Sequence, residues 1–415
     1  MRQSIIFILY LLCTFTTRSQ SVLTSEQAGS IYYAYPAPSS TYTPAPTGYE
    51  PFYISHYGRH GSRWMTADER YTEVVCVFDS LYQCSELTPL GVDVRERLHK
   101  VWEDARGCSG SITPLGERQH REIAERMYRN FPQVFRGGAF IDARSSTSLR
   151  CAMSMSYFTE RLKELNPALQ VNRRAYHRYM DYIAYTSPEG EKFASEKAPW
   201  RRGFREFEKK NVRPERLMAS LFVKPEAITD QDAMMRSLYW IAADMQNVEL
   251  DLSFYDIFEY EELVGVWKTV NARMYVCNAA APLNGGLMPR CAVPLLRNIL
   301  ESADAAIEKG TPAADLRFGH DTHLIRLLAL MQIEGCSNQE VDMEKFHLAW
   351  QDYRVSPMGA NLQLIFYRDK KNDILVKFLL NECEVTLPLK SKMVPYYSWK
   401  EVETFLAEII GKEQP

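Results

Sequence analysis

The sequence has 415 residues, of which 46% are hydrophobic and 24% charged, as is ordinary for a soluble globular protein. This is enough chain for a large core and for two structural units. Lysine and arginine number 49 against 52 aspartate and glutamate residues, which gives a formal net charge of -3. Because affinity for a phosphate backbone requires a clear basic excess, this balance argues against a nucleic-acid-binding protein, and we expect no nucleic-acid partner.

The N-terminus has the pattern of a cleavable signal peptide. Arg2 gives a short basic start, residues 5–15 are mostly apolar, and residues 17–19 (Thr-Arg-Ser) fit a cleavage site. We therefore exclude residues 1–19 from the fold and expect a periplasmic or secreted protein. The apolar run is too short to cross a bilayer, and no later stretch reaches the roughly 20 residues that a spanning helix needs, so we expect no membrane span.

The cysteines suggest disulfides and no metal site. Without Cys13, which lies in the apolar run, eight of the nine cysteines remain, an even number that fits pairing in an oxidising compartment. Cys277 and Cys291 bracket a loop with proline and glycine, so we expect them to pair locally. No two cysteines show the Cys-x-x-Cys spacing of a zinc or thioredoxin-like site.

Residues 20–51 are rich in tyrosine, proline, serine and threonine, which favours an extended arm that covers the domain or is disordered in part. The first candidate site follows: residues 52–54 predict a buried strand, and Arg59-His60-Gly61-Ser62-Arg63 comes soon after. Two guanidinium groups suit a doubly charged tetrahedral anion, and the imidazole between them could attack phosphorus. For a lone Arg-His pair, solvated charges beside a structural histidine are the alternative.

The second candidate site lies at the start of a predicted helix. Thr88-Pro89 and Thr113-Pro114 have the residue types favoured at the N-cap and first position of helices, so each predicts a helix start. A strand at residues 140–143 then leads through a turn rich in serine and threonine into a helix at residues 149–165. Free N–H groups and the helix dipole make such a helix start a natural anion site.

Residues 166–260 change in character. Long charged and aromatic helical stretches without a strong strand pattern indicate an inserted α-helical cap, which divides an α/β domain into residues 52–165 and 261–415. The basic cluster between Arg201 and Arg216 would suit a polyanionic substrate. Its interleaved glutamates favour an ordinary solvated face instead.

The third candidate site lies in the second part of the α/β domain. A predicted strand that begins near Asp315 leads to His320-Asp321 and a helical run. Residues 361–367 and 374–380 predict further strands, and a final helix covers residues 399–410. All three sites thus follow predicted strands, at the carboxyl ends where open α/β sheets bind ligands.

These sites resemble a known family. Arg59-His60-Gly61-Ser62-Arg63 resembles the signature of the histidine acid phosphatases, the branch of the histidine phosphatase superfamily that includes phytases, glucose-1-phosphatases and multiple inositol polyphosphate phosphatases. The pattern Arg-x-Ser-x-x-x-Arg, from Arg144 to Arg150, resembles its middle motif, and His320-Asp321 resembles its distal motif. The chain departs from the family at Trp64-Met65, where a proline is usual. Its His-Asp form counts against the multiple inositol polyphosphate phosphatase branch proper, which has His-Ala-Glu.

The resemblance implies an α/β fold with a central mixed β-sheet flanked by helices and an inserted α-helical cap. It implies that His60 attacks phosphorus to form a phosphohistidine, and that Asp321 protonates the leaving oxygen and then activates water. Because His60 must be neutral and Asp321 protonated, we expect a mildly acidic optimum. No cofactor or metal is implied, and the expected substrate is an inositol phosphate such as phytate or a sugar phosphate such as glucose 1-phosphate. The phosphoryl oxygens would be held by Arg59, Arg63, Arg150 and His320, with Arg144 equally well a structural residue.

Three alternatives come from other classes. His56-x-x-x-His60 and His320-Asp321 could be ligand pairs of a metal-dependent phosphohydrolase, although the neighbouring arginines would repel a divalent cation. A phosphomutase could use the same phosphohistidine, but the export signal and the helical insertion favour hydrolysis. A secreted protein that binds phosphate or carbohydrate without turnover is the non-enzymatic alternative.

Overall fold

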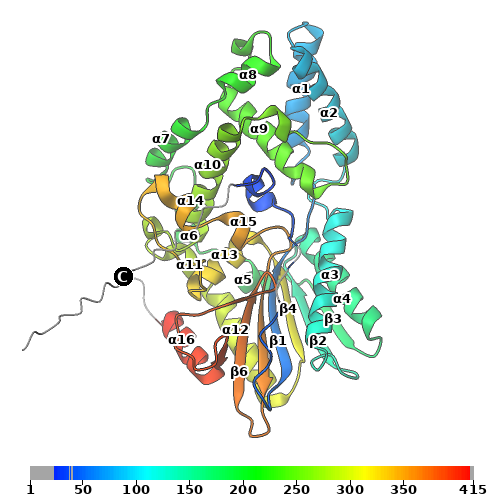
Figure 1. Cartoon of the computed structure of the whole chain (residues 1–415), viewed down its shortest axis with the longest axis vertical. Helices are drawn as coiled ribbons and strands as arrows, with labels where there is room; N and C mark the ends of the chain where they lie inside the picture. The colour runs from blue at the N-terminus through cyan, green and yellow to red at the C-terminus, as the bar shows by residue number, and fades with distance from the viewer. Residues whose placement is uncertain (1–22, 37, 39–40, 412–415) are drawn as a thin grey trace, which may run out of the picture.

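The computed structural model describes residues 23–36, 38 and 41–411 (Figure 1). The expected signal peptide at residues 1–19 lies outside the described residues, as does Cys13. Within the described ranges, no helix combines the length and the apolar character that crossing a membrane requires.

A mixed sheet of eight strands forms the centre of the α/β part, as expected from the sequence. Seven strands follow the order β3-β2-β4-β1-β5-β6-β7, and β8 pairs with β6. The first four in this order run parallel, whereas β5 and the strands beyond it pair antiparallel. The strands are β1 (Glu50–Arg59), β2 (Phe140–Ser145), β3 (Gln170–Arg174), β4 (Ala314–Gly319), β5 (Asn361–Arg368), β6 (Ile374–Leu380), β7 (Cys383–Val385) and β8 (Tyr396–Ser398).

Helices cover both faces of this sheet because its central strands are buried on both sides. Successive side chains of β1 point to opposite faces: Tyr53 joins one core, and Ile54 joins the other. The Tyr53 face packs against α12 (Val293–Lys309), α13 (Asp321–Leu330) and α16 (Trp399–Gly411). The Ile54 face packs against α3 (Pro114–Asn130) and α4 (Leu149–Leu165).

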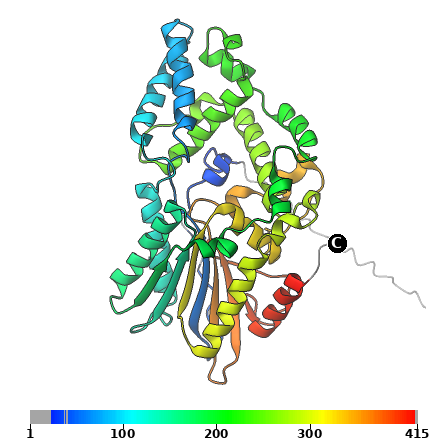
Figure 2. The same ribbon diagram turned by 180° about the vertical axis from the view of Figure 1, so that it is seen from behind.

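A third core holds together a helical layer beyond the carboxyl ends of the parallel strands (Figures 1 and 2). It contains helices from the expected cap and also the helix pair of residues 69–105, whose apolar faces pack on the cap helices. For example, the Phe78 ring lies 5.1 Å from the Phe222 ring, with the two planes tilted at 56°. Residues 170–174, expected in the cap, instead pair with β2 as the edge strand β3. The layer comprises α1 (Glu69–Gln83), α2 (Pro89–Ala105), α8 (Glu215–Leu221), α9 (Gln231–Asp244) and the first half of α10 (Tyr260–Asn278). The neighbouring α7 (Arg201–Asn211) buries Phe204 and Phe207 in the core of the Tyr53 face instead.

Short helices connect these layers. They are α5 (Met180–Ile183), α6 (Pro188–Ala194), α11 (Leu287–Arg290), α14 (Phe346–Ala349) and α15 (Asp352–Val355), with 3-10 turns η1 (Gln27–Tyr32), η2 (His177–Tyr179), η3 (Pro225–Ala227), η4 (Met245–Asn247), η5 (Tyr255–Ile257), η6 (Pro282–Asn284) and η7 (Met343–Lys345).

The first described part of the N-terminal arm, which contains η1, lies between the helical layer and the sheet and is drawn in dark blue (Figure 1). Ala28 and Tyr32 are buried in the core of the helical layer. The Tyr239 hydroxyl donates to the Ala28 carbonyl at 2.6 Å, and the Asn247 amide donates to the Tyr32 carbonyl at 2.9 Å. The arm is therefore a structural component of the junction and not only a surface cover.

Local signals in the sequence placed several helix ends correctly. The Thr88 and Thr113 hydroxyls accept hydrogen bonds from the third residue of α2 and α3, at 3.1 and 3.2 Å, and proline follows each of them as predicted.

The expectation of a disulfide between Cys277 and Cys291 is wrong, because neither of these two cysteines forms a disulfide bond. Cys277 packs in the core at the end of α10, whereas Cys291 lies beyond η6 and α11 with its sulfur 3.6 Å from the Leu287 carbonyl.

Candidate active site

Three strand ends bring the three candidate sites to one edge of the sheet. Arg59, the last residue of β1, lies opposite Gly319 at the end of β4. On the other side of β4, Ser145 at the end of β2 lies opposite Phe318. Because the three strands are parallel and in register, the residues that follow them meet beneath the helical layer.

His60 is a buried, neutral imidazole. Its Nδ1 lies 3.0 Å from the Gly61 carbonyl oxygen. A carbonyl can only accept, so Nδ1 carries the hydrogen and Nε2 carries the lone pair. Burial, followed by the charges of Arg59 and Arg63, holds the pKa of His60 well below its ordinary value. The ring therefore presents a nucleophilic nitrogen at neutral and mildly acidic pH.

The start of α3 is hydrogen-bonded to the loop that carries His60. The Thr113 backbone N–H donates to the Ser62 carbonyl at 3.0 Å, and the Ser62 N–H donates to the Gln119 side chain at 2.9 Å. A methyl group on Gly61 would lie 2.7 Å from the Gly116 carbonyl oxygen, and one on Gly116 would lie 2.1 Å from the Ser62 carbonyl oxygen. The two glycines therefore permit a backbone contact that fixes the position of His60.

Arg59 bridges the arm, the sheet and the third motif. Its Nη1 donates to the Ile31 and Ser356 carbonyls at 2.6 and 2.8 Å, and its Nη2 lies 3.3 Å from an Asp321 carboxylate oxygen. Its Nε and Nη2 are buried and make no hydrogen bond within the described chain. Burial lowers the pKa of Arg59 to about 10, so the guanidinium remains charged. Two N–H directions are thus free for an anion.

Arg63 is oriented by the arm. Its Nη1 donates to the Tyr32 hydroxyl at 3.1 Å and to the Trp64 carbonyl at 2.9 Å. Its guanidinium carbon also lies 4.8 Å from the centre of the Tyr32 ring. Sequence reasoning missed both Tyr32 and Ile31, because no motif marks an arm residue whose hydroxyl or carbonyl orients an arginine 28 or more positions away.

The two arginines of the middle motif have different environments. Arg144 forms ion pairs with Asp142 and, at 3.3 Å, with Asp315, so it is a structural residue of the sheet. Arg150 lies in the first turn of α4, and no carboxylate in the described part of the chain comes within ion-pairing distance of it. Burial and then the charge of Arg63 lower the pKa of Arg150. It is a cation that lacks a counter-ion.

The third motif supplies an imidazole and a carboxylate. The His320 ring lies 5.8 Å from the His60 ring, and its Nε2 is 3.3 Å from the Ser146 hydroxyl. Burial, and then Arg150, lower the pKa of His320 to about 4. Burial would raise the pKa of Asp321, but the charge of Arg59 brings it below its ordinary value. Asp321 therefore carries a negative charge in the free site.

The site as a whole has an excess of positive charge. Its six residues are Arg59, His60, Arg63, Arg150, His320 and Asp321. Three arginines face one carboxylate, while both imidazoles are neutral, so two positive charges remain uncompensated. A dianionic phosphate monoester matches this excess.

The residues proposed as metal ligands do not form a ligand cluster. The His56 ring packs against Phe158 and Phe318, with centroids 5.4 and 5.2 Å away. In the part of the chain that the structure describes, no group of three or more histidine, cysteine, aspartate or glutamate side chains has positions suited to a metal ion.

The basic cluster from Arg201 to Arg216 is paired with acidic neighbours at both of its ends. Arg201 pairs with Glu196 at 3.1 Å, and Arg216 pairs with Glu262 at 2.5 Å. The interpretation as an ordinary surface with interleaved charges therefore fits better than a polyanion site.

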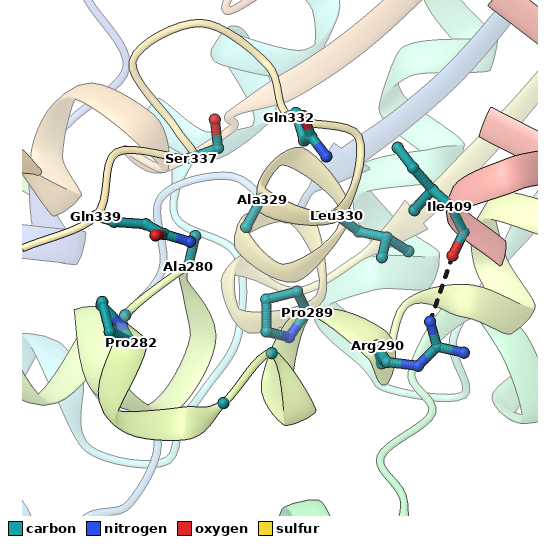
Figure 3. Close-up of a pocket in the computed structure, with 13 residues that line it drawn as sticks. Ala280, Pro282, Pro289, Arg290, Ala329, Leu330, Gln332, Ser337, Gln339 and Ile409 are labelled. Carbon is teal, nitrogen blue, oxygen red and sulfur yellow. Dashed lines mark hydrogen bonds between the residues drawn. The ribbon is translucent and has the colours of Figure 1, made fainter. Parts of the chain in front are cut away.

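Two cavities differ in their relation to this site. A cavity of about 560 Å³ lies beside η6, α11 and the end of α16, where Arg290 donates to the Ile409 carbonyl at 3.3 Å (Figure 3). A second cavity of about 390 Å³ includes Ile31 and Thr322 in its wall. Ile31 binds Arg59 through its carbonyl, and the Thr322 N–H donates to Asp321 at 2.8 Å, so only this second cavity adjoins the six residues.

Solved structures with a similar fold include three phosphatases. Multiple inositol polyphosphate phosphatase of Bifidobacterium longum, in complex with phosphate, is 19% identical with a TM-score of 0.79 over 92% of this chain and 97% of that one. The phytase of D. castellii is 14% identical with a TM-score of 0.66, over 93% and 85%. Hafnia alvei phytase in complex with tartrate is 13% identical with a TM-score of 0.54, over 88% and 98%. At these identities the likeness establishes the fold.

No curated protein matches the sequence. Residues 59–381 match the histidine phosphatase superfamily, branch 2, and this range contains all six residues of the site. The chain therefore belongs to the histidine phosphatase superfamily, branch 2, and is a phosphatase.

Proposed function

We propose that the protein is an exported phosphomonoesterase that hydrolyses inositol phosphates through a phosphohistidine at His60. One observation carries this proposal: a neutral imidazole with a free Nε2 lies among three arginines whose charge is only partly compensated. This arrangement attracts a phosphate dianion and offers it a nucleophile.

In the first step, the lone pair of His60 Nε2 forms a bond to phosphorus while the ester P–O bond breaks. The leaving oxygen takes a proton from the Asp321 carboxyl group. In the second step, the Asp321 carboxylate takes a proton from water, the water oxygen bonds to phosphorus, and the N–P bond breaks to release inorganic phosphate. Arg59, Arg63, Arg150 and His320 stabilise the charge on the phosphoryl oxygens in both steps.

Asp321 must gain a proton before it can act as the acid, although Arg59 favours its ionised form in the free site. A bound phosphate dianion would occupy Arg59 and place negative charge beside Asp321, which raises the pKa of this carboxyl group. Protonation thus follows substrate binding, and it supports the expectation of a mildly acidic optimum.

Inositol phosphates are the substrates favoured by the charge of the site and by the fold. The similar solved structures include phytases, and that of the Bifidobacterium longum enzyme has been determined with inositol hexasulfate. Export rests on the signal peptide pattern at residues 1–19. N-terminal sequencing of the natural protein tests it: a start near residue 20 supports export, and a retained leader contradicts it.

The test of the activity is phosphate release by the purified chain from phytate, glucose 1-phosphate and an aryl phosphate, with EDTA present. His60→Ala should abolish release, while His177→Ala, which alters an exposed histidine of η2, should not. Preference for phytate supports the proposal. Turnover of only glucose 1-phosphate or the aryl phosphate would reject inositol phosphates as the substrate, and undiminished activity in His60→Ala would reject the nucleophile.

A further inference from the structure

The cavity of about 390 Å³ beside the catalytic residues has its own positive charge. It lies where α7, α9, α10 and α13 meet η1, and its wall continues into the site through Ile31 and Thr322. Three of the residues that line it are arginines, Arg236, Arg273 and Arg326, against a single glutamate, Glu208. The wall therefore has two positive charges in excess.

Arg326 is the most unusual of these residues. It follows Asp321 on α13 by five positions, or about 7.5 Å along the helix axis. It is 5% exposed, its Nε donates to the Asn278 side chain at 3.1 Å, and its Nη1 donates to the Thr186 hydroxyl at 2.7 Å. Both acceptors are neutral, and no carboxylate of the described residues lies within ion-pairing distance of this guanidinium; Asp321 acts on it only at longer range.

A buried arginine can be stable without a carboxylate when all of its nitrogens are bonded. Arg317 in β4 shows this, since its three nitrogens donate to Asn298, Ser55 and Ser302 and it lines neither of the two cavities described above. Arg326 differs, because its Nη2 makes no hydrogen bond within the described chain and the residue lines a cavity. Nη2 is not one of the buried atoms without a partner, so it reaches solvent-accessible space, where an anionic ligand would form a charge-assisted hydrogen bond with it.

The other two arginines differ in how firmly they are paired. Arg236 is bound to Glu208 at 3.0 Å. Arg273 is 56% exposed, and its contact with Glu196 is 3.5 Å long, so it is free to turn toward a ligand. Phe204, Trp240 and Met274 add apolar surface to the cavity, which suits the carbon ring of a substrate between its charged groups.

We propose that Arg326 and Arg273 bind a second phosphate of the substrate while the first lies at His60. The enzyme thereby selects rings that carry several phosphates over simple monoesters. This inference rests on the proposed function, because it requires turnover at His60 and a substrate with more than one phosphate.

The test compares kcat/KM for phytate with kcat/KM for p-nitrophenyl phosphate, as a ratio, in Arg326→Gln. Loss of charge-assisted hydrogen bonds should lower this ratio by about tenfold or more. Arg326→Lys keeps the charge and should retain part of the preference. Arg290→Gln removes a guanidinium from the other cavity and should leave the ratio at the wild-type value.

Arg273→Gln is a second variant that does not disturb a buried position. It should lower the ratio by about two- to fivefold, as for an exposed charge. In wild type, myo-inositol hexakissulfate should inhibit p-nitrophenyl phosphate hydrolysis, and it should do so more weakly in both glutamine variants.

An unchanged ratio and unchanged inhibition in both variants would overturn the inference while leaving the proposed function intact. If the wild-type enzyme itself showed no preference for phytate, the proposed substrate class would fail, and the inference with it.

Discussion

Gly61→Ala tests whether the backbone contact between the His60 loop and α3 sets the position of the nucleophile. The new methyl group would lie 2.7 Å from the Gly116 carbonyl oxygen and 2.9 Å from its Cα, about 0.7 Å short of the 3.4 Å at which ordinary contact begins. Both obstacles are backbone atoms, and the Ser62 carbonyl is bonded to Thr113 at 3.0 Å, so the loop must move. Overpacking of this kind costs about 1–3 kcal/mol of stability.

A displacement of this size at the nucleophile should lower kcat by about 100-fold. The assay is steady-state hydrolysis of an aryl phosphate, with the melting temperature measured in parallel. Gly203→Ala is the matched control, because no heavy atom lies within 4 Å of its new methyl group on the exposed face of α7. It should keep wild-type activity and gain about 0.5–1 kcal/mol of stability. Wild-type kcat in Gly61→Ala would refute the role of this contact.

Three further predictions concern the arm, the acid and the buried histidines. Tyr32→Phe removes the hydroxyl that accepts from Arg63 and should weaken inhibition by inorganic phosphate by about fivefold; an unchanged inhibition constant would count against this role of the arm. Asp321→Asn should lower kcat/KM for phytate by about 10²–10⁴-fold and kcat/KM for an aryl phosphate less, since kcat/KM reports the steps through phosphoryl transfer to His60 and a phenolate leaves without a proton; equal losses of kcat/KM would reject Asp321 as the acid. Burial lowers the pKa values of His56 and His120 to about 3. The unfolded chain then binds protons first as the pH falls below 6.5, so stability is full above that pH and declines toward pH 3. The urea midpoint should fall between pH 7 and pH 4.5, and less so in His120→Leu; a wild-type midpoint independent of pH would contradict this.

The sequence predicted the elements that short-range patterns determine. Thr113-Pro114 indicated a helix start because N-cap and first-turn preferences are local, and the strand before Arg59 followed from its apolar residues. The meeting of the three motifs followed from the rule that parallel strands end at one edge.

The contacts that position the site could not be predicted in the same way. Ile31 binds Arg59 through a backbone carbonyl, a group that every residue possesses, so no residue type indicates it. Thr88-Pro89 predicted the start of α2 but not its packing partner, and α1 and α2 pack in the helical layer although residues 52–165 were expected in the α/β domain. The role of Gly116 depends on a close approach to Ser62 over a long sequence separation.

The proposed mechanism requires a covalent phosphoryl intermediate at His60. Asp321→Asn should slow its hydrolysis, because the water then lacks a base, while an aryl phosphate still forms it. The measurement is the mass of the peptide that contains His60, after the variant is mixed with the aryl phosphate and quenched in alkali. We predict the added mass of one phosphoryl group on His60, stable in alkali, lost in acid and absent when His60→Ala is combined with Asp321→Asn. A phosphoryl group on another residue would contradict this mechanism. Turnover without any phosphoryl adduct, in the wild type and in Asp321→Asn, would contradict it as well.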